Sequence, residues 1–157
     1  MLERFSKSYR MINKEKFVEK LINFSVDQDY FILLNSNNNS DKYDLLCGYG
    51  VKSFIKSSEN SLKKLDNFFE LKKDWLFGYM TYDLRNEIEV LNDDNIDFIN
   101  MPNLYFFQPK IVWCVKGKSV TGLSFEKDLI DNDWKKFSEI SEKEKTKNSN
   151  IVKLNLR

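Results

Sequence analysis

The chain has 157 residues, of which 41% are hydrophobic and 15% aromatic, and its 25 basic and 24 acidic residues give a net charge of +1. A domain of this length can bury a core, and so much aromatic surface argues against a disordered chain. The balanced charge, with only four arginines among the basic residues, argues against nucleic acid or an acidic membrane surface as a partner.

Histidine is absent from the sequence. This excludes a Ser-His-Asp or Cys-His triad and any zinc or haem site that depends on histidine. The two cysteines, Cys47 and Cys114, lie far apart in apolar runs, which predicts buried reduced thiols and a cytoplasmic protein. Residues 1–10 are polar and charged, and no run approaches the roughly 20 apolar residues of a membrane span, so we expect no secretory signal and no membrane partner.

The first half of the chain alternates predicted strands and helices. Asn13 is a suitable N-cap for a helix that ends near Ser25, because apolar residues recur after it at helical spacing. Short apolar runs between polar residues predict strands. The predicted strands are residues 7–12, 30–34 and 43–49, and a second helix is predicted over residues 57–73. Gly48 and Gly50 indicate a β-bulge or a close backbone approach.

The second half begins with a strongly aromatic strand at residues 75–82. Asp83 can cap a short helix over residues 84–90, and a polar loop follows at 92–100. Strands are then predicted at 104–107 and 110–115, followed by a hairpin turn at 116–118, a return strand at 119–125 and a helix over 132–145.

These elements predict an α+β fold: a mostly antiparallel sheet or sandwich of seven or eight strands with three or four helices. Residues 1–141 are expected to form one domain. Residues 142–157 are interpreted as a linker and the start of a strand whose partner lies elsewhere.

Two groups of carboxylates are possible sites, and they consist of Asp83, Glu87 and Glu89, and of Asp93, Asp94 and Asp97. A glycosidase pair or a metal site are the alternatives considered, but the second group lacks the glycine of a calcium loop. We interpret both groups as solvated charges and assign no catalytic and no metal-binding residue. The Gly48-Tyr49-Gly50 sequence is too short a match for a phosphate-binding loop.

A polar strand end at Leu34, Asn35 and Ser36, beside Tyr43, is the candidate binding site. A buried strand that ends in Asn-Ser places hydrogen-bonding side chains at the rim of a sheet, where they can bind the amino and carboxylate groups of a small ligand. The alternative is an ordinary polar loop.

The aromatic strand at residues 75–82 is apolar on both of its faces. Such a strand is usually covered on both sides. We therefore expect it to lie in the core, with the option that part of its cover comes from a region outside this chain.

Four stretches occur in an order that resembles a known family, namely Leu-Leu-Asn-Ser at 33–36, Tyr-Asp-Leu-Leu at 43–46, the aromatic strand and the residues after it at 75–89, and Pro-Asn-Leu-Tyr-Phe-Phe-Gln-Pro at 102–109. The most specific part is Gly78-Tyr79-x-x-Tyr82-Asp83, with the Asn-Glu-x-Glu that follows. Over residues 7–125 the chain resembles the N-terminal domain of aminodeoxychorismate synthase component I, the para-aminobenzoate branch of the chorismate-utilising enzymes. Anthranilate synthase component I is the sister branch.

The resemblance implies a role in folate biosynthesis. In that family the whole enzyme replaces the C4 hydroxyl of chorismate with an amino group, using ammonia from a glutamine amidotransferase, component II. Mg²⁺ and the chorismate site belong to a C-terminal catalytic domain whose motifs this chain does not contain. We therefore expect no cofactor in this chain and no activity from it alone. Its expected partners are the catalytic domain, component II and, as a homodimer, a second copy.

The resemblance also bears on the strand end. The N-terminal domain of the family can hold a tryptophan site, and its Leu-Leu-x-Ser segment corresponds to Leu33, Leu34 and Ser36. Anthranilate synthases usually carry Glu where Asn35 stands, so the resemblance favours the para-aminobenzoate branch and predicts weak tryptophan binding. The alternatives are a stand-alone module that binds an amino acid and the N-terminal domain of anthranilate synthase component I.

Overall fold

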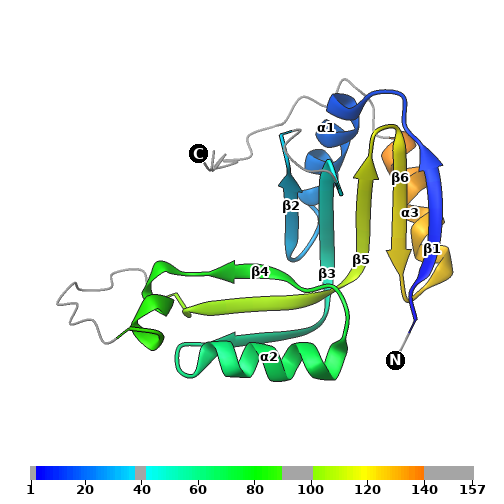
Figure 1. The fold of residues 1–157 in the computed structure, drawn as a ribbon. Coiled ribbons are helices and arrows are strands. Elements are labelled where there is room, and N and C mark those ends of the chain that lie inside the picture. Colours follow the sequence, from blue (N-terminus) through cyan, green and yellow to red (C-terminus); the bar gives the residue numbers. More distant parts are fainter. Residues whose placement is uncertain (1–2, 38–41, 90–100, 140–157) are drawn as a thin grey trace.

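The computed structural model describes residues 3–37, 42–89 and 101–139. The strands are β1 (Phe5–Arg10), β2 (Phe31–Asn35), β3 (Leu45–Ser57), β4 (Phe77–Met80), β5 (Leu104–Lys116) and β6 (Ser119–Ser124), and the helices are α1 (Lys14–Ser25), α2 (Ser61–Lys72), the 3-10 helix η1 (Tyr82–Glu87) and α3 (Lys127–Glu139). All six strands pair antiparallel in one sheet, in the order β1-β6-β5-β3-β2, and β4 also pairs with β5 (Figure 1). The predicted α+β fold is confirmed, with six strands in the described part of the chain.

The long strands β3 and β5 bend together and divide the sheet into two halves (Figure 1). The wide half contains β1, β2 and β6 with residues 45–49 and 111–116, and the narrow half contains β4 with residues 53–57 and 104–107. The register of β3 shifts between Val51 and Ser53, next to Gly50, whose φ is +67°. A bulge increases local twist and bends the strand, so the expected irregularity near Gly50 is where the sheet turns.

Helices α1 and α3 cover one face of the wide half. The side chain of Asn13 caps α1 by accepting a hydrogen bond from the backbone N–H of Lys16 at 2.8 Å, as predicted. The residues of this core alternate along each strand, as the two-residue repeat of a strand requires. We call it the first core, and it consists of Met11, Phe17, Leu21, Phe24, Leu45, Cys47, Tyr49, Ile111, Trp113, Val115, Val120, Ile130 and Phe137.

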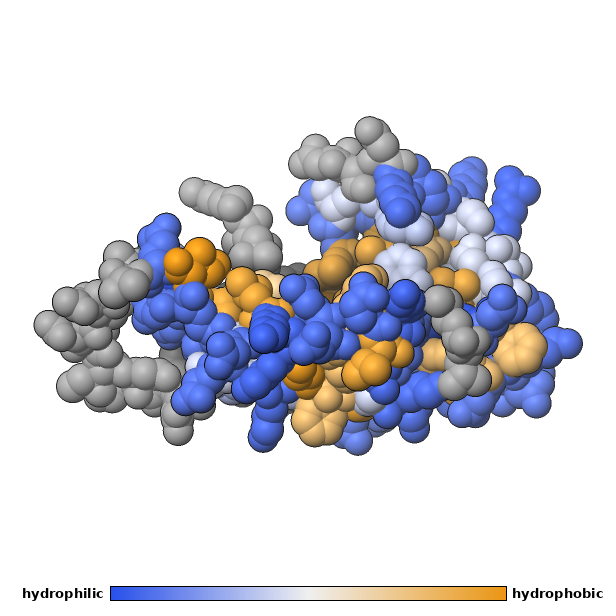
Figure 2. All heavy atoms as spheres, turned by 60° about the horizontal axis from the view of Figure 1, so that its bottom comes forward, coloured by the Kyte–Doolittle hydropathy of each residue, from blue (hydrophilic) through white to orange (hydrophobic). Residues whose placement is uncertain are grey.

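Helix α2 packs against β3 and β5 in the narrow half. Leu65 and Phe68 are half-buried, whereas Leu62 and Phe69 are 37% and 47% exposed. Figure 2, which turns this side forward, shows hydrophobic side chains scattered among hydrophilic ones. The α2 side is therefore an ordinary mixed surface.

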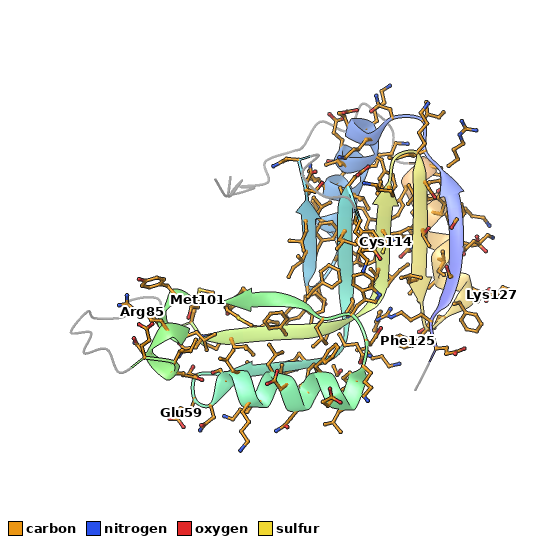
Figure 3. The ribbon with its side chains drawn as sticks, viewed as in Figure 1. Glu59, Arg85, Met101, Cys114, Phe125 and Lys127 are labelled. Carbon is orange, nitrogen blue, oxygen red and sulfur yellow. The ribbon has the colours of Figure 1, made fainter. Side chains whose placement is uncertain are left out.

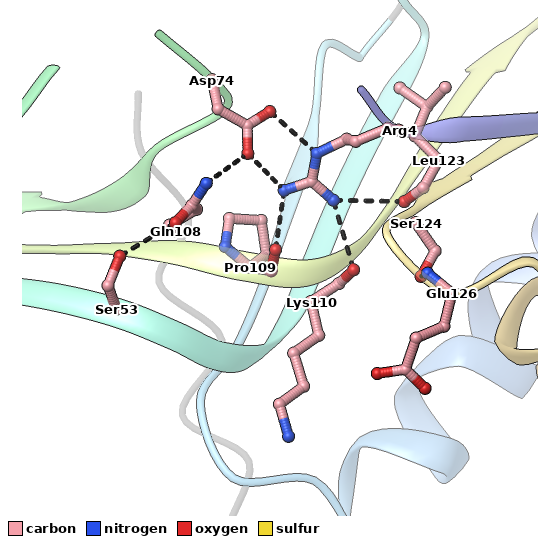
Figure 4. A network of polar contacts seen from close by, with 9 residues as sticks. All are labelled: Arg4, Ser53, Asp74, Gln108, Pro109, Lys110, Leu123, Ser124 and Glu126. Carbon is pink, nitrogen blue, oxygen red and sulfur yellow. Dashed lines mark hydrogen bonds and ion pairs between the residues drawn. The ribbon is translucent and has the colours of Figure 1, made fainter. Parts of the chain in front are cut away.

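The bend is held by Arg4, which lies just before β1 (Figure 4). Its guanidinium contacts both carboxylate oxygens of Asp74 at 2.8 and 2.7 Å and donates to the carbonyl oxygens of Pro109 and Lys110 at 2.7 and 3.2 Å. Gln108 donates to the same carboxylate at 2.8 Å and accepts from Ser53. One polar network thus joins the two bent strands, β3 and β5, to the start of β1 and to the segment before β4.

Several predicted elements differ in the structure. The strand expected at 43–49 is β3, which continues to Ser57, and the helix expected from residue 57 begins at Ser61. The strands expected at 104–107 and 110–115 are one strand, because Pro109 stands opposite Val51 at the bulge, where a missing N–H is tolerated. The helix expected from residue 132 begins at Lys127. The helix expected over 84–90 is η1, and Thr81 rather than Asp83 precedes it. The loop predicted at 92–100, and the linker and strand start predicted at 142–157, lie outside the described residues.

Candidate functional site

The predicted strand end lies at one end of β2, beside Asp44. Both the backbone N–H and the hydroxyl of Ser36 donate to the carbonyl oxygen of Asp44, at 3.1 and 3.2 Å. The Asp44 carboxylate in turn accepts from the backbone N–H of Gly117 at 2.7 Å and from Lys116 at 3.0 Å. These two hydrogen bonds lower the pKa of the Asp44 carboxyl. The strand end is thereby tied to the turn between β5 and β6.

Asn35 lines a hollow of about 300 Å³ beside α1. The other residues of this hollow are Lys14, Glu15, Val18 and Asn37. The Asn35 side chain also accepts a hydrogen bond from the backbone N–H of Asn37 at 3.1 Å. The hollow offers an amide, an ammonium and a carboxylate within one small space, which is chemistry that can hold a polar ligand.

Tyr43 and Leu34 lie away from this hollow. Tyr43 packs edge-on against Trp75, with ring centroids 5.9 Å apart, in a cluster on the face of the sheet opposite to α1. Leu34 is 53% exposed, and strand alternation places it on the same face as Ile32, a member of that cluster. Asn35 and Tyr43 are therefore on different sides of the sheet. A binding pocket shared by Leu34, Asn35, Ser36 and Tyr43 stays a prediction.

That opposite face of the wide half is apolar and carries none of the described helices. Val112 and Cys114 of β5 point to this face, between first-core residues Ile111, Trp113 and Val115, which point to α1 and α3. Around them lie the half-buried side chains of Ile32, Leu46 and Leu123, with Trp75 and Phe77. We call this surface the open face.

The aromatic strand β4 covers the part of the open face around Gly48. Phe77 is 4% exposed, and a Cβ added at Gly48 would lie 2.8 Å from its ring, so glycine lets β4 approach the sheet. Met80 at the end of β4 is 47% exposed. The strand predicted to be core is thus core at Phe77 and surface at Met80. The expected close approach at Gly48 is confirmed.

The two cysteines lie back to back in the sheet. Cys47 faces the first core and is fully buried. Cys114, which is labelled in Figure 3, faces the open face and is 8% exposed. Burial raises the pKa of the Cys47 thiol far above its ordinary value and that of Cys114 to about 11. Neither thiol has the lowered pKa of a nucleophile.

The first carboxylate group proves to be partly structural. Both oxygens of Glu87 accept hydrogen bonds from Ser61 at the start of α2, one from its backbone N–H and one from its hydroxyl, each at 2.5 Å. Glu87 is exposed, in agreement with its interpretation as a solvated charge, but its contact with a helix end was not expected. Asp83 and Glu89 are exposed, and Asp93, Asp94 and Asp97 lie outside the described residues.

Within the described ranges, no group of three His, Cys, Asp or Glu side chains is placed to hold a metal ion. None of the described helices is long and apolar enough to cross a membrane. The sequence matches no model of a known protein family and no curated protein.

Sequence reasoning raised the option of an uncovered face at the aromatic strand without locating the open face, and it did not find the Arg4 network. A local signal for the open face exists, because β5 is apolar at five successive positions from Ile111 to Val115, which indicates burial on both sides. No local signal exists for the Arg4 network, because Arg4 and Asp74 are 70 positions apart.

Proposed function

We propose that this chain is the non-catalytic N-terminal domain of aminodeoxychorismate synthase component I, a cytoplasmic enzyme of para-aminobenzoate synthesis, and that it scaffolds the catalytic domain. The open face is the observation that carries the proposal. A sheet with two helices on one face and apolar side chains such as Ile32, Leu46 and Leu123 on the other has a surface suited to a partner domain. The family motifs at 33–36 and 75–89 suggest which domain that is.

The position of the motifs supports this role. Leu34 and Ser36 lie at the edge of the wide half, and the Gly78-Tyr79 motif lies on β4, which partly covers the open face. Both motifs therefore border the surface to which the catalytic domain would bind. In this proposal the catalytic domain supplies the Mg²⁺ and chorismate sites, and component II supplies ammonia.

The test starts from the reading frame that follows this chain in its gene. We expect it to encode a chorismate-utilising catalytic domain, and unrelated coding sequence there would refute the proposal. The two parts are then expressed separately and mixed. Size-exclusion chromatography should show a complex, which Leu34→Lys weakens and Val26→Lys on the helix-covered side does not.

An amino-acid-binding regulatory module is the second candidate function. The observation in its favour is the hollow beside Asn35, which contains both an ammonium group and a carboxylate group from Lys14 and Glu15. Calorimetry with tryptophan distinguishes the two functions. Binding that is lost in Ser36→Ala and Asn35→Leu would favour the module, and the domain proposal predicts weak binding at most.

A further inference from the structure

A second cavity with polar and apolar walls lies at the bend of the sheet, on the side of α1 and α3. Its volume is about 390 Å³, and its walls come from the end of α1, the loop before β2, the middle of β3 and β5, and α3. It is separate from the strand end and from the open face. The lining residues used below are Phe24, Asp27, Asp29, Tyr49, Lys110, Ile111, Leu129, Asp133 and Lys136.

A buried hydrogen-bond chain forms the inner wall. Trp113 donates its indole N–H to the hydroxyl oxygen of Tyr49 at 3.0 Å, and Tyr49 donates to Oδ2 of Asp133 at 2.7 Å. Asp133 is only 2% exposed although it carries a carboxylate. Burial of a carboxylate is unfavourable unless it is paired, so this wall is built around a group that attracts a positive charge.

The protein itself places an ammonium group at this wall. Nζ of Lys136 lies 3.1 Å from Oδ1 of Asp133 and 5.8 Å from the ring centroid of Phe24. An ammonium between a carboxylate and an aromatic face is a favourable arrangement. The Lys136 side chain is 57% exposed, so its ammonium stays in contact with solvent while it pairs with the buried carboxylate.

Three further charges line the cavity, namely those of Asp27, Asp29 and Lys110. Within the described residues none of them has an ion-pair partner. Asp27 and Asp29 follow the C-terminal end of α1, where the helix dipole is negative, and no basic residue occupies the last turn of that helix. Lys110 enters from β5. The cavity therefore has a region that favours a cation and, in Lys110, an ammonium without an ion-pair partner among the described residues, which favours an anion.

Apolar side chains also line the cavity. Phe24 and Ile111 are buried, and Leu129 and Val51 are half-buried, so together they offer a surface for an apolar group. A ligand that satisfies all three parts of the lining carries an ammonium, a carboxylate and an apolar body.

We propose that this cavity binds a small zwitterion of that kind, with its ammonium towards Asp27 and Asp29, its carboxylate towards Lys110 and its apolar body against Phe24 and Leu129. This site is independent of the scaffold role, because it lies in the helix layer. A partner domain on the open face would leave it accessible from the opposite side of the sheet.

Three matched probes test the proposal by two-dimensional NMR titration of the full chain. Phenylalanine carries both charges, phenethylamine lacks the carboxylate and 3-phenylpropionate lacks the ammonium. We expect phenylalanine to shift the resonances of Tyr49, Ile111 and Leu129 and to bind about tenfold more tightly than either relative, since each lost charge removes one charge-assisted contact.

Variants at the two charged regions make the test specific. Lys110→Met keeps the aliphatic stem and should abolish the preference for phenylalanine over phenethylamine. Asp27→Asn with Asp29→Asn should abolish its preference over 3-phenylpropionate. Lys118→Met, in the turn between β5 and β6, is the control and should change neither preference.

Several results would overturn the proposal. One is equal affinity for the three probes, and another is the absence of shifts at Tyr49, Ile111 and Leu129 with every common amino acid at millimolar concentration. Shifts at Ser36 and Tyr43 instead would place amino-acid binding at the strand end and would equally reject this cavity. A failed complex with the catalytic domain would refute the scaffold role but not this site.

Discussion

Arg4 and Asp74 form a two-point ion pair that joins the start of β1 to the segment before β4, and their side chains are only 7% and 12% exposed. The geometry requires a guanidinium, because its planar fork matches a carboxylate at two points and still reaches the carbonyl oxygens of Pro109 and Lys110. The pair therefore fixes the angle between the two halves of the sheet (Figure 4).

Arg4→Lys should lower the free energy of unfolding by about 2 kcal/mol, because lysine keeps the charge but loses the two-point contact and leaves buried carbonyl oxygens without donors. Urea denaturation followed by tryptophan fluorescence measures the change. Arg10→Lys on the same strand is the matched control, because Arg10 is exposed. Equal stability of the two variants would show that the network does not hold the bend.

The same pair predicts a loss of stability in acid. Burial raises the pKa of the Asp74 carboxyl, but the hydrogen bonds from Arg4 and Gln108 outweigh it and hold this pKa below its ordinary value of 3.8. A carboxyl whose pKa is lower in the folded state stabilises the fold above pH 3.8, and this contribution disappears as the pH falls through the folded pKa. Below pH 4, the free energy of unfolding should therefore decrease less with falling pH in Asp74→Asn than in the original chain.

The contact between Glu87 and Ser61 predicts a second stability effect. Asn60, which precedes α2, has a left-handed conformation and its side chain makes no capping hydrogen bond, so Glu87 replaces it from η1. Glu87→Leu should lower the free energy of unfolding by about 1–2 kcal/mol, the usual loss for a helix cap. Glu89→Leu is the control. A smaller change for Glu87 than for Glu89 in urea denaturation would contradict this role.

Local patterns were sufficient for much of the fold. The Asn13 cap, the turn around Gly117 and the apolar repeat of β2 are each determined within a few residues, and the structure contains all three. The continuity of β5 through Pro109 and the role of Glu87 were not predictable in this way. Both depend on a neighbour that is remote in sequence: the bulge in β3 and the start of α2.

The candidate site shows the same division. The sequence predicts correctly that a strand ends near Asn35, because the apolar run stops there, but this strand is half-buried at the edge of the sheet and not buried as expected. It does not predict which side chains meet around that end, since strand alternation sends Asn35 towards α1 while Tyr43 packs on the open face. The bend of the sheet, which creates the cavity beside Tyr49, depends on the register of two long strands and has no counterpart in a short motif.

The positions of the cysteines predict unequal reactivity. Cys114, whose pKa burial raises to about 11, is slightly exposed on the open face, and Cys47 is fully buried. With a thiol-specific chromogenic reagent at pH 8, both should react slowly in the folded chain, and Cys114 should react first. The Cys114→Ser variant identifies the remaining signal as that of Cys47. A rapid reaction of Cys47 would contradict the packing of the first core.

Catalysis provides a direct check of the scaffold role. The purified chain, incubated with chorismate, ammonia and Mg²⁺, should form neither aminodeoxychorismate nor anthranilate. The reason is that the chain has no histidine and lacks the family's catalytic motifs. Product that increases in proportion to the amount of protein would refute this expectation.

The open face also predicts how the chain behaves without a partner. Its apolar side chains lie next to β2, which pairs only with β3 among the described strands and carries no charged residue from Phe31 to Asn35. The other outer strand, β1, carries Lys7 and Arg10, and charges of this kind discourage pairing with another chain. We therefore expect self-association as a symmetric homodimer that buries the open face and the β2 edge.

Light scattering over a series of concentrations measures this association. Leu34→Lys places a charge at the 53% exposed position on β2 and should shift the population towards monomer. Val26→Lys introduces the same charge at a 67% exposed position after α1, away from the open face, and should leave the association unchanged. The added charge has little effect on folding at either exposed position, so a difference between the variants reports the interface. A chain that stays monomeric at every concentration would refute the homodimer, and the same two variants would still test the complex with the catalytic domain.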